Sequence, residues 1–158
     1  MFTLRASRNR DLPRNFEIWR TSVLATHQFL SATDFQAISE LVERAYLPTA
    51  DLMVAVDAHD LAHGFLGLTG HHIDALFVHE KCRGQGIGSL LLGSSLVGLK
   101  EATVDVNEQN SAAGSFYRSR GFKVRGRSPL DGEGRAYPLL HMHWKGEPTP
   151  LELRDYTP

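Results

Sequence analysis

The sequence predicts an α/β protein in which a mixed sheet carries helices on both faces. Two amphipathic helical stretches follow a short N-terminal strand, and after Pro48 strand-like segments alternate with further helices. A glycine-rich loop at 83–88 leads from a largely apolar strand into an apolar helix. These observations give the element order β-α-α-β-β-β-α-β-α-β-β.

The N-terminal region is expected to form a strand and a first helix. Residues 2–6 are the strand candidate, with Phe2 and Leu4 on one face. Asp11 is the expected N-cap of the helix, and Pro13 is tolerated in its first turn. The inward stripe of this helix consists of Phe16, Trp19 and Val23.

A second helix is expected to end before Pro48, because the residue before a proline is biased away from helix. Its start signal is the cluster of Ser31, Thr33 and Asp34. Gln36 lies three residues after Thr33, as in a capping box. The apolar stripe of this helix consists of Phe35, Ile38, Leu41, Val42 and Ala45.

The remaining elements follow from apolar segments separated by turn residues. The segment 73–78 is largely apolar, as expected for a central strand, and Gly121 is the expected stop of the last helix. The expected strands are 52–56, 61–69, 73–78, 102–106, 122–124 and 137–144, and the expected helices are 87–99 and 111–120. The tail 146–158 is expected to be irregular or docked on a neighbour.

Length and composition narrow the class of protein. A chain of 158 residues with 42% hydrophobic content fits one domain, expected over 1–145. The net charge of −1 gives no reason to expect nucleic acid or a membrane as partner. Cys82 is the only cysteine, so an intrachain disulfide is excluded. With neither a signal segment nor an apolar run near the ~18 residues that span a bilayer, a cytoplasmic location is expected.

The loop 83–88 has the properties of an anion site. Its sequence, Arg-Gly-Gln-Gly-Ile-Gly, follows a buried strand and opens an apolar helix. Glycines let backbone N–H groups turn toward one point, and the helix N-terminus adds unpaired donors and a partial positive charge. Such a loop binds a pyrophosphate without a cationic patch, and Arg83 could add a charged contact.

Three other interpretations of this loop arise from the sequence. A tight strand-to-helix turn that binds nothing has the same spacing. A dinucleotide site would need its glycines soon after the first strand, and a Walker loop would need Gly-Lys-Ser/Thr. The last two are therefore disfavoured.

The loop resembles the first signature of the GNAT (GCN5-related) N-acetyltransferase superfamily, Arg/Gln-x-x-Gly-x-Gly/Ala. A second block resembles that family as well: Asn107-Glu108-Gln109-Asn110, followed by Phe116-Tyr117 and Gly121-Phe122. Together the blocks cover about 72–125, and the segments 25–30, 127–129 and 137–140 resemble the YjaB type of small bacterial acetyltransferase. The resemblance implies a mostly antiparallel mixed sheet of six to seven strands with about four helices.

The resemblance also implies acetyl-CoA as the acetyl donor and assigns residues to it. Tyr117 takes the position from which a phenol reaches the thioester sulfur, where it would serve as general acid to the CoA thiolate. A backbone N–H near Val78 could stabilise the developing oxyanion. The implied cofactor-binding residues are Leu76, Phe77, Val78, Arg83, Gly84, Gln85, Gly86, Ile87, Gly88, Ser89, Asn110 and Tyr117.

The acceptor amine must lose a proton, yet no glutamate lies between Glu43 and Glu80, where some members of the family place a base on the strand before the loop. His27 and His72 are the candidate bases, because histidine titrates near neutral pH. His72 and Asp74 are expected to share a strand face. The expected acceptor residues are Trp19, His27, Phe29, His72, Asp74 and Tyr137.

Several points stay open from the sequence. The acceptor is a primary amine of a small molecule or of a peptide, and a homodimer is neither required nor excluded. The pairs His59/His63 and His141/His143 give only a weak metal signal, so no metal is expected. Cys82 lacks an evident base and is a poor nucleophile candidate. The alternative to an enzyme is an acetyl-CoA-binding sensor without turnover.

Overall fold

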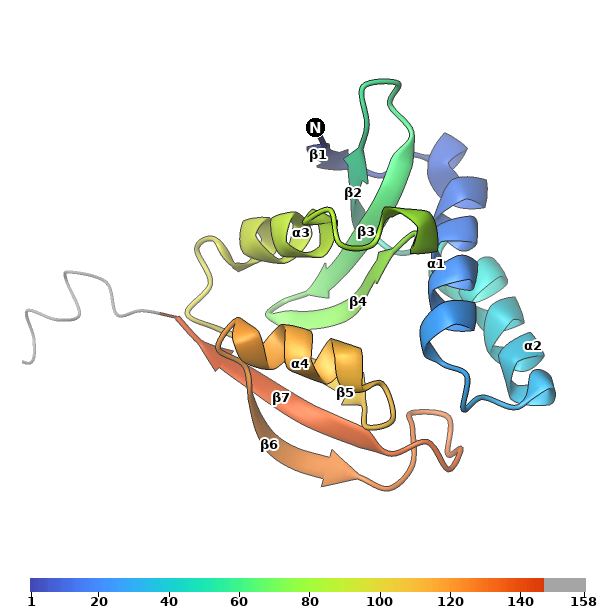
Figure 1. The fold of residues 1–158 in the computed structure, drawn as a ribbon, viewed down its shortest axis with the longest axis vertical. Helices are drawn as coiled ribbons and strands as arrows, with labels where there is room; N and C mark the ends of the chain where they lie inside the picture. The colour runs from blue at the N-terminus through green and yellow to red at the C-terminus, as the bar shows by residue number, and fades with distance from the viewer. Residues whose placement is uncertain (147–158) are drawn as a thin grey trace, which may run out of the picture. The chain divides into compact units, whose positions relative to one another are not determined.

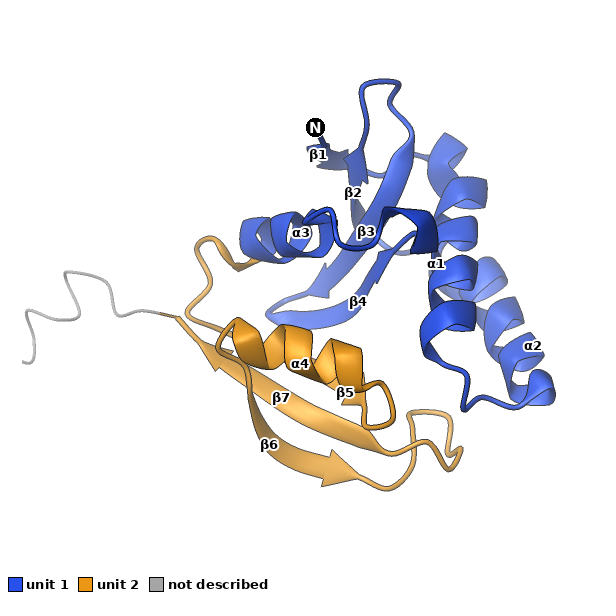
Figure 2. Cartoon of the chain, viewed as in Figure 1, with its two compact units in different colours: residues 1–95 blue, residues 96–158 orange. Residues whose placement is uncertain are grey.

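The computed structural model describes residues 1–146, which form two compact units, Met1–Ser95 and a second unit from Leu96 on (Figure 1, Figure 2). Most of the predicted irregular tail, 147–158, lies outside the described residues. The described part contains seven strands and four α-helices in the predicted order. No helix of the described part is long and apolar enough to cross a membrane.

The first unit contains four strands in the spatial order β1-β2-β3-β4, with all three pairs antiparallel. Its strands are β1 (Thr3–Ala6), β2 (Leu52–Val56), β3 (Ala62–Thr69) and β4 (His72–Val78). Its helices are α1 (Leu12–Thr26), α2 (Ala32–Leu41) and α3 (Ile87–Leu96). Short 3-10 turns occupy Asn9–Asp11 and Glu80–Cys82, and a π-helical turn, Val42–Tyr46, extends α2.

Helices cover both faces of this sheet. Ile18 and Trp19 of α1 pack in one core cluster with Phe65 of β3. Side chains alternate along a strand, so the neighbouring Gly64 faces the opposite side. A Cβ at Gly64 would meet Ile87 Cγ2 of α3 at 2.7 Å, which shows how closely that helix approaches the strand. The glycine therefore permits helix packing on the second face.

Both helix starts are where the sequence predicted them, but their side-chain hydrogen bonds differ from the prediction. Asp11 stands at the N-cap position of α1, but its side chain does not cap the helix. Its carboxylate instead accepts hydrogen bonds from the Arg5 guanidinium and the Arg8 backbone N–H, because a charged fork outcompetes a single N–H donor. In α2 the cap is Ser31, whose hydroxyl accepts from the Asp34 N–H, so the capping box from Thr33 does not form.

The second unit contains three antiparallel strands in the order β5-β7-β6, with one helix. Its elements are β5 (Glu101–Asn107), α4 (Ser111–Ser119), β6 (Lys123–Ser128) and β7 (Leu139–Lys145). Val104 pairs with Met142 across the strands, and both are buried. Phe122 lies between the rings of Tyr117 and Trp144, which joins the helix to the sheet.

Candidate active site

The strand before the glycine loop is followed by a structured turn. The N–H of His79 donates to the His63 carbonyl at 2.8 Å, which extends the pairing of β3 and β4 by one residue. The His79 ring then caps the 3-10 turn Glu80–Cys82, since its Nδ1 accepts from the Lys81 N–H at 3.1 Å. Burial lowers the pKa of His79, so its ring stays neutral and keeps this acceptor. These two hydrogen bonds of His79 therefore hold the residues that precede the glycine loop in place.

Gly84 and Gly86 give the loop its shape. Their φ angles are 78° and 82°, a left-handed backbone conformation that residues with a Cβ rarely adopt. A Cβ at either position would meet nothing within 4 Å, so open space lies beside the backbone of both residues. The hydrogen-bond ladder of α3 begins with the Leu90 N–H donating to the Gly86 carbonyl at 3.0 Å. The N–H groups before Leu90 thus stand at a helix N-terminus that fits a pyrophosphate.

Arg83 lies next to these donors on the exposed side of the loop. Its Nη1 is 3.4 Å from a carboxylate oxygen of Glu80, and both side chains are nearly half exposed. A pair of this kind has a small interaction energy, so Arg83 can exchange Glu80 for a phosphate at little cost. Gln85 lies in the loop between the two glycines, and Ile87, Gly88 and Ser89 form the first turn of α3.

β4 contains a bulge at Asp74. Gly67 of β3 pairs with Ala75, while the next residue, Leu68, pairs with Ile73, which leaves Asp74 without a partner in the ladder. The bulge shifts the alternation, so His72, Ala75 and Phe77 lie on one face. The Thr69 hydroxyl donates to the Asp74 carboxylate at 2.5 Å, and Thr69 pairs with His72. His72 and Asp74 are therefore on the same side, as expected, but a bulge rather than simple alternation places them there.

The Asn-x-x-Asn segment of the second unit forms a turn that starts α4. The Asn107 side chain accepts from the Gln109 N–H at 3.1 Å, and its carbonyl accepts from the Asn110 N–H. Asn110 is the N-cap of α4, with its Oδ1 accepting from the Ala113 N–H at 3.2 Å. That bond uses the side-chain oxygen, so a cofactor contact would come from the amide Nδ2 donors.

Tyr117 lies in the core of the second unit, with 6% of its surface exposed. Its ring makes edge contacts with Phe116 and Phe122, each at 5.2 Å between centroids. Burial raises the pKa of the Tyr117 phenol above its usual value, so the hydroxyl keeps its proton throughout the neutral range. A protonated phenol in a rigid aromatic setting is suited to donate a hydrogen bond to a thiolate.

His27 follows the last turn of α1, and its ring lies against that of Phe29 in a tilted arrangement, with centroids 5.2 Å apart. Burial lowers the pKa of its imidazole, which favours the neutral form. The Thr26 hydroxyl lies 2.8 Å from His27 Nδ1 and also donates to the Ser22 carbonyl. Since that hydroxyl has one proton, Nδ1–H donates to Thr26, and Nε2 carries the free lone pair that a base needs.

The other expected acceptor residues differ in position. Trp19 has only 4% of its surface exposed and is stacked between Phe16 and Phe35, so it is a core residue rather than a surface for a substrate. Phe29, His72 and Asp74 belong to the first unit, whereas Tyr137 precedes β7 in the second unit.

Sequence reasoning did not identify Tyr46. It ends the π-helical turn, and its hydroxyl is buried without a hydrogen-bond partner within the part of the chain described. Burial, together with the negative charge of Asp74, raises the pKa of Tyr46 to about 12. The spacing of apolar residues in a helix does not predict a π turn. The position of the Tyr46 side chain could therefore be found only from the structure.

The histidine pairs raised for metal binding have other partners. His141 Nδ1 lies 2.6 Å from Asp105, and His143 Nε2 lies 3.1 Å from Glu101, both across the β5–β7 ladder. Among the residues described, no group of three side chains could hold a metal ion. The expectation that Cys82 lacks a base is wrong, because His63 Nδ1 is 3.3 Å from its sulfur.

The comparisons with known proteins agree with this geometry. Residues 23–144 match the family described as "Acetyltransferase (GNAT) domain". The chain belongs to this family, and it is an acetyl-CoA-dependent N-acetyltransferase with a GNAT fold.

Within the family, the chain is similar to two proteins named "Peptidyl-lysine N-acetyltransferase YjaB". It is 46% identical to that of Salmonella typhimurium, covering 90% of this chain and 97% of the relative. It is 44% identical to that of Escherichia coli K12, covering 92% and 99%. The solution structure of apo-form YjaB from Escherichia coli superimposes with a TM-score of 0.87 over 93% of this chain and 99% of the other.

Proposed function

We propose that this protein transfers the acetyl group of acetyl-CoA to the side-chain amine of lysine in a protein or peptide. The assignment of lysine as the acceptor is supported by the near full-length similarity, at 44% and 46% identity, to two peptidyl-lysine N-acetyltransferases. A small-molecule amine is the other acceptor class that the sequence leaves open. The residues of this chain suggest how each part of the reaction is supported.

The loop from Arg83 to Ser89 holds the pyrophosphate of the donor. Gly84 and Gly86 have the left-handed conformation and open surroundings that let backbone N–H groups approach a ligand. The adjacent α3 N-terminus contributes donors and a favourable dipole. The backbone of Leu76 to Val78 and the Asn110 amide are the proposed contacts with the pantetheine arm.

Tyr117 acts on the sulfur that leaves during transfer. Because burial holds its proton, the phenol donates a hydrogen bond to the thiolate and lowers the energy of the departing group. Full proton transfer from a phenol with a raised pKa to a thiolate is uphill, since a free thiol has a pKa of about 8.5. Hydrogen-bond donation is therefore the main form of acid assistance here, and solvent supplies the final proton.

His27 is the proposed base for the amine. A lysine ammonium must lose a proton before attack, and a neutral imidazole with a free Nε2 can accept it directly or through water. His72 is the second candidate, at the start of β4.

Asp74 is the proposed contact for the ammonium of the lysine side chain. Asp74 is exposed at the bulge of β4, where its carboxylate can attract an ammonium. The buried Tyr46 hydroxyl has an unused acceptor oxygen within the electrostatic reach of Asp74. Phe29 would line the apolar methylene chain of the acceptor.

The test is a CoA-release assay with acetyl-CoA and matched acceptors. Peptides containing one lysine are compared with the same peptides carrying norleucine, and with small amines such as free lysine and spermidine. Mass spectrometry of the peptide products locates the acetyl group. We expect turnover with the lysine peptides and none with the norleucine peptides.

Two other outcomes would decide against parts of this proposal. Faster turnover of a small amine than of every peptide would assign the acceptor to the small-molecule class. Binding of acetyl-CoA by calorimetry without CoA release from any acceptor would support the sensor alternative.

A further inference from the structure

A thiol, an imidazole and a carboxylate form a chain of contacts next to the cofactor loop. Cys82 Sγ lies 3.3 Å from His63 Nδ1, and His63 Nε2 lies 2.7 Å from Asp57 Oδ2. The three residues come from the turn before the loop, from β3 and from the β2–β3 turn. A nucleophile beside a base that is oriented by a third group is the arrangement that activates side chains for covalent chemistry.

The carboxylate end of this chain is held in place. Asp57 Oδ1 accepts from the backbone N–H groups of His59 and Leu61, which leaves Oδ2 for His63. The hydrogen bond from His63 lowers the pKa of Asp57 to about 2, so the carboxylate is ionised at neutral pH. An ionised carboxylate only accepts hydrogen bonds, and His63 Nε2 must therefore carry the proton.

The opposite nitrogen of His63 is consequently the acceptor that faces the thiol. Arg14 Nη2 lies 3.1 Å from the same Nδ1, so the guanidinium and the thiol alternate as donors to one lone pair. When the thiol gives its proton to Nδ1, Asp57 stabilises the imidazolium and Arg14 supplies positive charge near the thiolate. The nearby His79 ring is neutral, because burial lowers its pKa, and Lys81 adds a further cation.

We propose that Cys82 is a modification site that forms a mixed disulfide with small disulfides, and that this adduct closes the cofactor loop. His63 removes the thiol proton, and the Cys82 thiolate attacks one sulfur of the disulfide. A new S–S bond forms at Cys82 while the original S–S bond breaks, so Cys82 is oxidised and the disulfide is reduced. The second half leaves as a thiolate that takes a proton from water, and excess thiol reverses the reaction.

The effect on the loop follows from position. Cys82 is the last residue of the 3-10 turn and directly precedes Arg83, and its thiol is half-buried. The space beside Gly84 and Gly86 is open, so a tripeptide-sized adduct can extend into it and exclude the pyrophosphate. An anionic adduct would also repel the phosphates. This second half of the inference rests on the proposed role of the loop, whereas the reactivity of the thiol does not.

The reactivity is tested on the full chain with oxidised glutathione, by following the adduct by mass spectrometry. At neutral pH we expect the second-order rate constant to exceed that of N-acetylcysteine by ~10-fold or more. His63→Gln should lose that advantage, while His59→Gln, a histidine of the neighbouring turn, should keep it. Circular dichroism checks that each variant is folded.

A wild-type rate no greater than that of N-acetylcysteine, or an unchanged rate in folded His63→Gln, would overturn the proposal. If His63→Gln does not fold, the comparison of the wild-type rate with that of N-acetylcysteine decides.

The consequence for the loop is tested by measuring acetyl-CoA affinity of the purified adduct, the reduced protein and Cys82→Ser. We expect a loss of ~10-fold or more for the adduct and none for Cys82→Ser. If the thiol is reactive but the adduct binds acetyl-CoA normally, the proposal that the adduct closes the cofactor loop is wrong, and the proposed reactivity of Cys82 stands. Failure of the reduced protein to bind acetyl-CoA would instead count against the proposed function.

Discussion

The hydroxyl of Tyr46 stands directly over the α-carbon of Gly67. A Cβ built on Gly67 would lie 2.3 Å from the Tyr46 oxygen and 3.1 Å from Leu52 Cδ2. The glycine thus makes room for the phenol at the point where β3 pairs with Ala75, one residue beyond the bulge at Asp74. This contact connects the π-helical turn to β3, the strand that pairs with the one carrying Asp74.

Gly67→Ala should therefore destabilise the protein by ~1–3 kcal/mol, because the added methyl overpacks a filled space. Urea unfolding measures the change. Gly93→Ala is the matched control, since a Cβ there meets nothing within 4 Å and the residue lies in α3. That control should be neutral or slightly stabilising, as alanine is the better helix former. The double variant Gly67→Ala/Tyr46→Phe should recover part of the loss, because the atom at 2.3 Å is removed; strict additivity would contradict the contact.

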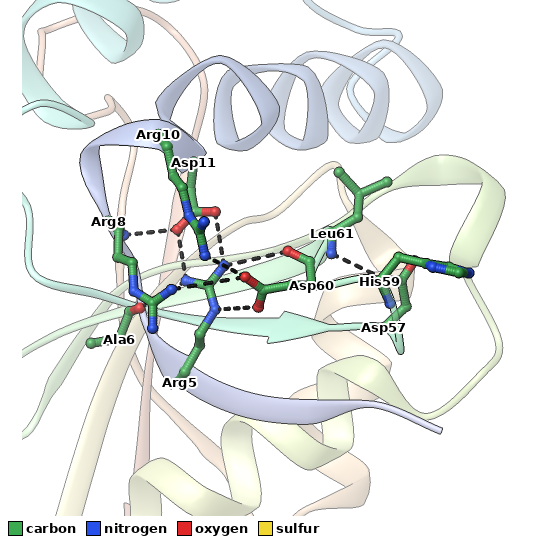
Figure 3. Close-up of polar contacts among 9 residues, drawn as sticks. All are labelled: Arg5, Ala6, Arg8, Arg10, Asp11, Asp57, His59, Asp60 and Leu61. Atoms are coloured by element: carbon green, nitrogen blue, oxygen red, sulfur yellow. Dashed lines mark hydrogen bonds and ion pairs between the residues drawn. The ribbon is translucent and has the colours of Figure 1, made fainter.

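Arg5→Met should cost ~1–3 kcal/mol, because it leaves the Asp11 carboxylate without its charged partner. Arg5 contacts both Asp11 and Asp60 (Figure 3). The Asp11 side chain is only 8% exposed. The same pairing lowers the pKa of Asp11, so this stabilisation is present above the unfolded pKa of about 4 and lost as the pH falls through the lower folded value.

The control for this pair is Arg10→Ala, which removes an exposed arginine that contacts only the Asp60 side of the cluster. Its effect should stay within ~0.5 kcal/mol. Chemical unfolding at neutral and acidic pH tests both variants. If Arg5→Met and Arg10→Ala lower the free energy of unfolding equally, the burial of Asp11 does not determine the effect of Arg5.

Gly86→Ala should weaken acetyl-CoA binding by ~10-fold, since a left-handed residue with a Cβ costs ~1–2 kcal/mol and the loop must shift to relieve it. Gly132→Ala is the control, because that loop glycine is equally open but lacks a left-handed φ. Calorimetric titration with acetyl-CoA distinguishes the two. Unchanged affinity in Gly86→Ala, and in the bulkier Gly86→Glu, would exclude this loop as the pyrophosphate site.

Tyr117→Phe should leave stability nearly unchanged, because the ring keeps its contacts with Phe116 and Phe122. Removing the donor to the leaving thiolate should reduce kcat by ~10²-fold or more, with little change in the KM for acetyl-CoA. Steady-state assays and thermal unfolding are measured together. A variant with the wild-type kcat would remove the phenol from the mechanism.

His27 should impose an acidic limit on both activity and stability. Burial places its folded pKa below the unfolded value of about 6.5, so the unfolded state binds more protons between the two values. Stability should therefore rise with pH across that window, and kcat/KM should fall as the pH drops through the folded value. His27→Gln should flatten the stability change; an unaltered pH profile of activity in this variant would assign the base role elsewhere, with His72→Gln as the next test.

Much of the fold was predictable because local patterns agreed with the tertiary structure. Apolar residues at helical spacing placed α1 and α2, and the glycine loop placed the start of α3. The hydrogen bonds at the two helix starts were not predictable, because more than one side chain competes for the same partner. At α2, Ser31 caps the helix in place of Thr33. At Asp11 the competitor was Arg5, which lies on another element and leaves no trace in the local sequence.

Some features of the candidate site were likewise predictable from the sequence, and others were not. The sequence by itself predicted the family, the glycine loop that we propose for the donor, and the helix that carries Tyr117, because these depend on residue types at short, fixed spacings. Only the tertiary structure decided that Trp19 is a core residue, that a bulge presents Asp74, and that Cys82 contacts His63, whose other ring nitrogen contacts Asp57. Those relationships join residues from different strands and turns, and strand pairing, not sequence distance, sets the separation of their side chains.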